Sequence, residues 1–235
     1  MKVLSFSLWG DNPKYTVGAI KNSELAKEFY SDWEMRLYHN DSVPDYVLEQ
    51  LESNNVTLVN TEQDLTHWNA LWRFIPASED IECMISRDCD SRLFERDVVA
   101  VNEWLKSDKM FHIIRDHPGG HMWEINAGMW GCRGGFLTDL KDQIEIYMSS
   151  KSSFDRSIDQ CFLRDVIYPK ARTSLFAHDE YFGYESFSTN IKRDRKLDDF
   201  AFIGEPFDEN DNQISNHRDM IRQRYWRDSG RTFCL

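Results

Sequence analysis

The segment that most constrains the fold is Ile81-Glu82-Cys83-Met84-Ile85-Ser86-Arg87-Asp88-Cys89-Asp90-Ser91-Arg92, a short apolar run that ends at two aspartates. A run of about five apolar residues bounded by charge is typical of a buried central strand. Ligands of open α/β sheets bind beyond the carboxyl ends of such strands, so we expect Asp88 and Asp90 at the ligand crevice. Two carboxylates spaced i and i+2 can surround one Mg²⁺ or Mn²⁺, which typically takes one or two protein carboxylates plus substrate phosphate. The stretch therefore predicts a metal-diphosphate site, with a merely solvated Asp-x-Asp loop as the alternative.

Length and composition favour one α/β domain over 1–235. The chain has 41% hydrophobic and 14% aromatic residues, which excludes wholesale disorder. A formal charge of −12 argues against nucleic acid as the main partner, because phosphate backbones demand a basic surface. No apolar run approaches the roughly 18 residues of a transmembrane segment. The five cysteines are scattered without C-x-x-C pairing, and this predicts reduced thiols and a cytoplasmic protein.

Apolar patterns outside the central stretch predict alternating strands and helices, which favours a largely parallel sheet flanked by helices. The strands are expected at 3–8, 35–38, 56–59, 110–114, 174–177 and 200–203. The helices are expected at 15–30, from 44 to about 51, at 65–75, 94–105, 137–148 and about 156–168, the last of these closed by Pro169. A charged tail follows from Asp208.

Seven motifs taken in order resemble a known family. They are Ser7-Leu8-Trp9-Gly10, Trp72-Arg73-Phe74, the Asp88-Cys89-Asp90 motif with its flanks, Arg115-Asp116-His117-Pro118, Asn126-Ala127-Gly128-Met129-Trp130-Gly131, Asp159-Gln160 and His178-Asp179-Glu180-Tyr181-Phe182. They look like the small GT-A fold, nucleotide-sugar-dependent glycosyltransferases of bacteria and large viruses, chloroviruses among them. The likeness covers the chain up to about Asn212.

The resemblance implies a GT-A type α/β/α sandwich with a mostly parallel sheet and a Rossmann-like nucleotide-binding half. The nucleotide-sugar half would be 1–107, the acceptor half 108–212 and the tail 213–235. Such an enzyme is a hexosyl- or pentosyl-transferase that binds a nucleoside-diphosphate sugar with Mn²⁺ or Mg²⁺, and a glycan acceptor. It would act in the cytoplasm of a bacterium or an infected host cell, as a monomer or weak homo-oligomer.

The resemblance also assigns the metal ligands. Asp88 and Asp90 fall at the family's metal motif. His178 sits where many of these enzymes carry a third ligand, on a loop after the last core strand, and an imidazole ligand would favour manganese. A surface histidine beside two acidic residues is the alternative for His178.

Other residues are expected to bind the donor. Trp9, Gly10 and Tyr15 follow the first strand, where the family holds the base and ribose, although Trp9 could equally be packing. Arg73 or Arg87 could contact the diphosphate, since arginine suits bidentate phosphate binding. Either arginine could instead be an ion-pair partner of an aspartate.

The acceptor side needs a general base if the reaction inverts, usually a carboxylate. Asp159 is our candidate, at the start of a helix, where an acidic residue is favoured by the macrodipole in any case. Asp116 and Glu124 are rival bases. The acceptor side would further include His117, Asn126, Gly128 and Trp130, although a buried strand explains 126–131 as well.

Two other functions remain open. A haloacid dehalogenase-like Mg²⁺-dependent phosphatase also presents Asp-x-Asp after a buried strand, with the first aspartate as nucleophile. In that family the motif follows the first core strand, whereas three strands come first here. A non-catalytic sugar-binding protein of the same fold is the second alternative.

Overall fold

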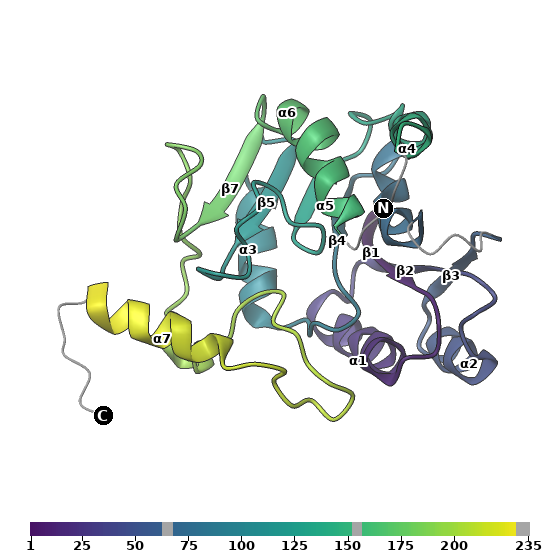
Figure 1. Ribbon diagram of the computed structural model, residues 1–235, viewed down its shortest axis with the longest axis horizontal. Helices are drawn as coiled ribbons and strands as arrows, with labels where there is room; N and C mark the ends of the chain where they lie inside the picture. Colours follow the sequence, from purple (N-terminus) through teal and green to yellow (C-terminus); the bar gives the residue numbers. More distant parts are fainter. Residues whose placement is uncertain (63–67, 152–156, 229–235) are drawn as a thin grey trace.

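The chain folds around a seven-stranded sheet in the computed structural model, which describes residues 1–62, 68–151 and 157–228 (Figure 1). The strands are β1 (Lys2–Leu8), β2 (Glu34–His39), β3 (Thr57–Asn60), β4 (Cys83–Ser86), β5 (Phe111–Arg115), β6 (Trp130–Arg133) and β7 (Leu175–Asp179). Their order is β3-β2-β1-β4-β6-β5-β7. Every neighbouring pair is parallel except those of β6, which runs antiparallel to β4 and β5. The mostly parallel sheet predicted from the sequence is therefore confirmed.

Helices cover both faces of this sheet and give it two cores. Helices α1 (Pro13–Phe29), α2 (Asp45–Ser53) and α3 (Glu95–Leu105) pack on one face, against Leu4, Phe6 and Ile85. The 3₁₀ helix η1 (Trp68–Ser78), α4 (Leu140–Ser149) and α5 (Ile158–Phe162) pack on the other, against Val3 and Met84. Because side chains of one strand alternate between the faces, β1 and β4 supply both cores at once. The result is the predicted α/β/α sandwich.

The helix expected at about 156–168 extends to Ala171 in the described residues instead of ending before Pro169. It passes from α5 through a π turn, η2 (Leu163–Ile167), into α6 (Tyr168–Ala171). A proline has no N–H and its ring clashes with the carbonyl of the preceding helical turn. The wider π turn before Pro169 displaces that carbonyl, so the chain can remain helical through the proline.

The strand expected at 200–203 does not form. Asp199 and Phe200 have φ angles of 50° and 61°, in the left-handed region, which an extended strand excludes. The apolar residues of this segment are buried by packing instead: Phe200 and Phe202 form a small core with Ile221. Ile221 belongs to α7 (His217–Asp228), so part of the charged tail is helical, and η3 (Arg195–Asp198) precedes the segment.

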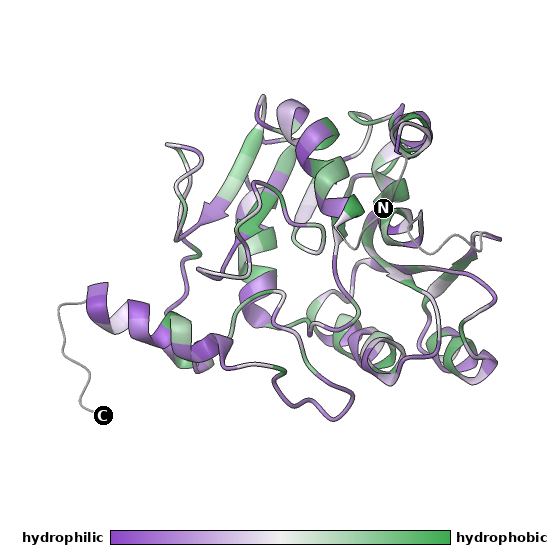
Figure 2. Cartoon of the chain, viewed as in Figure 1, coloured by the Kyte–Doolittle hydropathy of each residue, from purple (hydrophilic) through white to green (hydrophobic). Residues whose placement is uncertain are grey.

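Hydropathy follows this arrangement. Figure 2 shows the central strands as mainly hydrophobic and α7 as mainly hydrophilic. In the part of the chain described, no helix combines the length and apolar character needed to cross a membrane. The cysteines at 83, 89, 132 and 161 are free thiols, as expected from their spacing.

Candidate functional site

The sheet has a switch point between β1 and β4. From β1 the chain builds outward through β2 to β3, and then returns to place β4 on the other side of β1. In such sheets the loops that leave the two strands diverge and open a crevice at their carboxyl ends. A cavity of about 660 Å³ lies there. Its lining comprises Ser7, Leu8, Trp9, Gly10, Asp11, Asn12, Tyr15, Ala70, Arg73, Asp88, Cys89, Asp90, Ile158 and Asp159.

Hydrogen bonds to β1 and α1 hold the loop that carries Asp88 and Asp90. Cys89 is buried and its thiol donates to the Ser7 carbonyl at 3.3 Å, which turns Asp88 and Asp90 away from the core. The Asn22 amide donates to the carbonyls of Cys89 and Ser91 at 3.3 and 2.8 Å. A fixed backbone sets the two points from which the carboxylates project.

Each carboxylate has its own cation. Arg73, whose side chain is only 9% exposed, bonds Asp88 through Nη1 and reaches Asp159 Oδ2 through Nη2 at 2.9 Å. Lys14 Nζ lies 2.6 Å from Asp90 Oδ2. The Arg73 guanidinium thus joins Asp88 to Asp159, which lie 71 positions apart in the sequence.

Burial and mutual repulsion raise the pKa values of Asp90 and Asp159. Burial raises the pKa of Asp90, and the neighbouring Asp88 raises it further, whereas Lys14 lowers it. Burial likewise raises the pKa of Asp159 against the lowering effect of Arg73. Crowded carboxylates of this kind favour a bound cation, which relieves their repulsion.

The residues present fit a hard divalent cation. Asp88 and Asp90 offer oxygen ligands beside an open cavity, and Mg²⁺-type sites are commonly completed by substrate phosphate and water. Among the described residues no group of three His, Cys, Asp or Glu side chains could hold a metal, so protein ligands beyond the pair are not assembled in advance.

The predicted donor residues Trp9, Gly10 and Tyr15 line the same cavity. Trp9 remains 36% exposed, so part of its surface can contact a ligand. Gly10 has a φ of +71°, a conformation that costs glycine little, and its N–H donates to Ser42 Oγ at 2.7 Å. The loop after β1 therefore turns at Gly10, which lines the cavity.

Two predicted residues are not brought to the cavity. Arg87 points into the core and is 1% exposed, with Nε and Nη2 bonded to Asp97 at 2.9 and 2.5 Å. His178 lies within β7, not on a loop after it, and is 1% exposed. Its Nδ1 lies 2.9 Å from His112 Nε2 and its Nε2 lies 2.9 Å from Glu103 Oε2. Both residues have full sets of structural partners, so neither enters the site proposed below.

Most residues predicted for the acceptor side are buried and bound to structural partners. Asp116 is 1% exposed and accepts two bonds from Arg96 at 2.9 Å, while His117 Nδ1 accepts the N–H groups of Gly119 and Gly120. Trp130 begins β6, is fully buried and packs edge-on against Phe74. Its face is therefore unavailable to a sugar ring.

The remaining acceptor-side predictions lie closer to the motif. Asn126 is 4% exposed, and its amide faces the carbonyls of His121 and Trp123 at 3.4 Å. Gly128 packs directly on Asp88: a Cβ at this glycine would lie 1.9 Å from Asp88 Oδ2. The rival base Glu124 accepts bonds from Arg115 through its main-chain carbonyl and does not line the cavity.

The sequence reasoning missed several residues of the site. Lys14, Asn22 and Asp11 were not singled out, although Asp11 directly follows the Trp9-Gly10 pair. A lysine in the first turn of a helix is unusual because the helix dipole disfavours cations there. That signal could have marked Lys14 as the partner of an acidic group.

Comparison with known proteins supports the fold. No protein-family model matches the chain, and no curated protein matches it. Among solved structures, TarS 1–349 of S. aureus aligns with a TM-score of 0.50 at 11% identity, over 76% of this chain and 58% of its own. A glycosyltransferase involved in glycosylation of the major capsid of PBCV-1 aligns with a TM-score of 0.47 at 18% identity, over 76% and 81%.

A third structure is glucosyl-3-phosphoglycerate synthase of Mycobacterium tuberculosis in complex with Mn²⁺, UDP and phosphoglyceric acid. It aligns with a TM-score of 0.45 at 15% identity, over 85% of this chain and 72% of its own. At these identities the likeness concerns the fold alone. The chain has the GT-A type α/β fold that its motifs predicted.

Proposed function

We propose that this chain is a metal-dependent glycosyltransferase that moves a hexosyl or pentosyl group from a nucleoside-diphosphate sugar to an acceptor hydroxyl, most simply that of a glycan. One observation carries the proposal. Asp88, Asp90 and Asp159 line a single cavity at the switch point of the sheet, together with Trp9 and Tyr15, and Arg73 joins Asp88 to Asp159.

Residues of the cavity lining would hold different parts of the donor. Trp9 and Tyr15 line the cavity and would hold the base and ribose, because aromatic rings can stack on a base. Asp88 and Asp90 would hold Mn²⁺ or Mg²⁺. When bound there, the metal would act as a Lewis acid that stabilises negative charge on the diphosphate leaving group.

Asp159 is our candidate for the base that takes the acceptor proton. It reaches the cavity from the first turn of α5, and the raised pKa that burial gives it brings the carboxylate closer to a useful proton affinity. Arg73 holds its Oδ2 and keeps the carboxylate oriented. Asp159 brings a residue of the predicted acceptor half into the cavity formed mainly by 1–107.

The test is a panel of UDP-, GDP- and dTDP-sugars with Mn²⁺, with release of nucleoside diphosphate as the readout. We expect thermal stabilisation by at least one nucleotide sugar, because a ligand that binds only the native state raises the melting temperature. Asp90→Ala should abolish both metal-dependent binding and turnover, and Asp159→Asn should reduce turnover while donor binding survives.

Parallel incubation with p-nitrophenyl phosphate and Mg²⁺ tests the phosphatase alternative. Phosphate release that depends on Asp88, without any nucleotide-sugar binding, would contradict the transferase. Donor binding without turnover on any glycan acceptor would instead favour the non-catalytic sugar-binding protein.

A further inference from the structure

Lys14 occupies a position that the helix alone disfavours. It is the second residue of α1, and the first turn of α1 contains no acidic residue to offset its charge. The positive end of the helix dipole repels a cation there and favours an anion. A negative partner from outside the helix would offset that cost.

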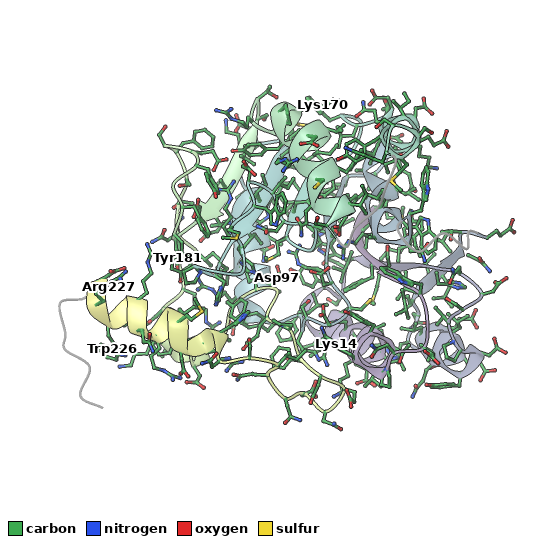
Figure 3. The ribbon with its side chains drawn as sticks, viewed as in Figure 1. Lys14, Asp97, Lys170, Tyr181, Trp226 and Arg227 are labelled. Carbon is green, nitrogen blue, oxygen red and sulfur yellow. The ribbon has the colours of Figure 1, made fainter. Side chains whose placement is uncertain are left out.

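Asp90 supplies that partner at the cavity. Lys14 Nζ lies 2.6 Å from Asp90 Oδ2, and the two side chains are 27% and 19% exposed. The ammonium also lies 5.0 Å from the ring centroid of Tyr15, which lines the cavity. Figure 3 labels Lys14 next to α1. Its flexible four-carbon stem leaves Nζ free to move between neighbouring anions.

Asp88 and Asp90 are consequently both neutralised by protein cations in the free chain, Asp88 by Arg73 and Asp90 by Lys14. A divalent ion on Asp90 would compete with the ammonium, because two cations repel each other across one carboxylate. The displaced ammonium would then need a new anion within reach.

We propose that Lys14 is a switching cation of the donor site, which neutralises Asp90 in the free protein and moves to the diphosphate of the donor when a divalent ion takes Asp90. The inference rests on the proposed function and adds the coupling between metal and donor. Lys14 opposes binding of the metal alone and supports binding of the nucleoside diphosphate once the metal is present. Metal and donor are thereby made mutually dependent.

The test measures two affinities of the full chain: that for Mn²⁺ alone, by electron paramagnetic resonance of free Mn²⁺, and that for UDP or GDP at saturating Mn²⁺, by calorimetry. In Lys14→Met the affinity for Mn²⁺ alone should rise by about tenfold, while the affinity for the diphosphate should fall by about tenfold. Lys14→Arg should retain diphosphate binding because it keeps the charge.

Lys21→Met is the matched control. Lys21 also belongs to α1, is 27% exposed and pairs with an aspartate at 2.5 Å, but that aspartate, Asp211, is not part of the cavity lining, whereas Asp90 is. Lys21→Met should leave both affinities unchanged. If Lys14→Met does not fold, Lys14→Gln keeps the polar side chain and is expected to shift the two affinities in the same opposite directions.

Opposite shifts support the switching role, since a merely structural lysine would move both affinities the same way. Unchanged affinities, or two losses, in a variant of a protein that binds Mn²⁺ and diphosphate would overturn this inference and leave the proposed function standing. If the unaltered protein binds neither Mn²⁺ nor any nucleoside diphosphate, the proposed function fails and this inference fails with it.

Discussion

Gly128 is predicted to set the position of Asp88, and replacing it with alanine tests the geometry of the motif directly. A Cβ at position 128 would lie 1.9 Å from Asp88 Oδ2, 2.5 Å from its Cγ and 3.0 Å from its Oδ1. All three atoms belong to one carboxylate end, which can rotate away. The rotation would break the contact between Asp88 and Arg73.

The cost follows from that contact. A hydrogen bond to a charged group contributes about 1.5–3 kcal/mol, and the 38% exposure of the Asp88 side chain places the expected loss lower, at about 1–2 kcal/mol. For a chain of this size the melting temperature should fall by about 2–8 °C. The affinity for Mn²⁺ should fall as well, because the carboxylate no longer faces the cavity.

Urea denaturation of four proteins measures the effect: the unaltered chain, Gly128→Ala, Asp88→Ala and the double variant. Asp88→Ala removes the clashing atoms, so the double variant should unfold like Asp88→Ala alone. Gly18→Ala is the comparison, since its Cβ would lie 2.1 Å from the main-chain carbonyl of Cys89, which truncation of Asp88 cannot relieve. If Gly128→Ala costs the same free energy with and without the Asp88 side chain, the packing argument is wrong.

Three further predictions concern the buried charges. Arg87→Met leaves Asp97 unpaired in the core and should lower the free energy of unfolding by about 3–5 kcal/mol. The Mn²⁺ affinity of the native protein should not change. An affinity loss like that of Asp90→Ala would show that Arg87 belongs to the site. Burial lowers the pKa of His112 well below its usual 6.5, with His178 and Arg87 adding to the effect, and burial also lowers that of His178, despite Glu103. The unfolded chain therefore binds more protons below pH 6.5, and stability should fall with decreasing pH by up to about 1.4 kcal/mol per pH unit for each histidine. Denaturation midpoints across this range should show a shallower slope for His112→Leu, and an unchanged slope would contradict the assignment. Finally, burial and the neighbouring Asp88 raise the pKa of Asp90, so its protonation begins above the usual 3.8. Mn²⁺ affinity should therefore start to decline at a higher pH than for an ordinary aspartate, and a titration that follows the ordinary value would count against the buried site.

Local pattern was sufficient for most of the fold. The apolar run before Asp88 predicted β4, and the alternation of short strands with helices predicted a largely parallel sheet. The failures fall where tertiary contacts override local preference. Phe200 and Phe202 look like strand residues, but they are buried against Ile221 of α7, and a π turn keeps the chain helical through Pro169.

For the site, the sequence by itself determined the aspartate pair and its place at the end of a central strand, because both follow from local hydrophobicity and charge. Only the tertiary structure decided which cationic side chains form ion pairs with Asp88 and Asp90. Arg87 adjoins Asp88 in sequence yet turns to Asp97, whereas Arg73 and Lys14 arrive from η1 and α1. The direction of a side chain depends on which face of the strand it leaves and which helices pack there, and long-range packing sets both.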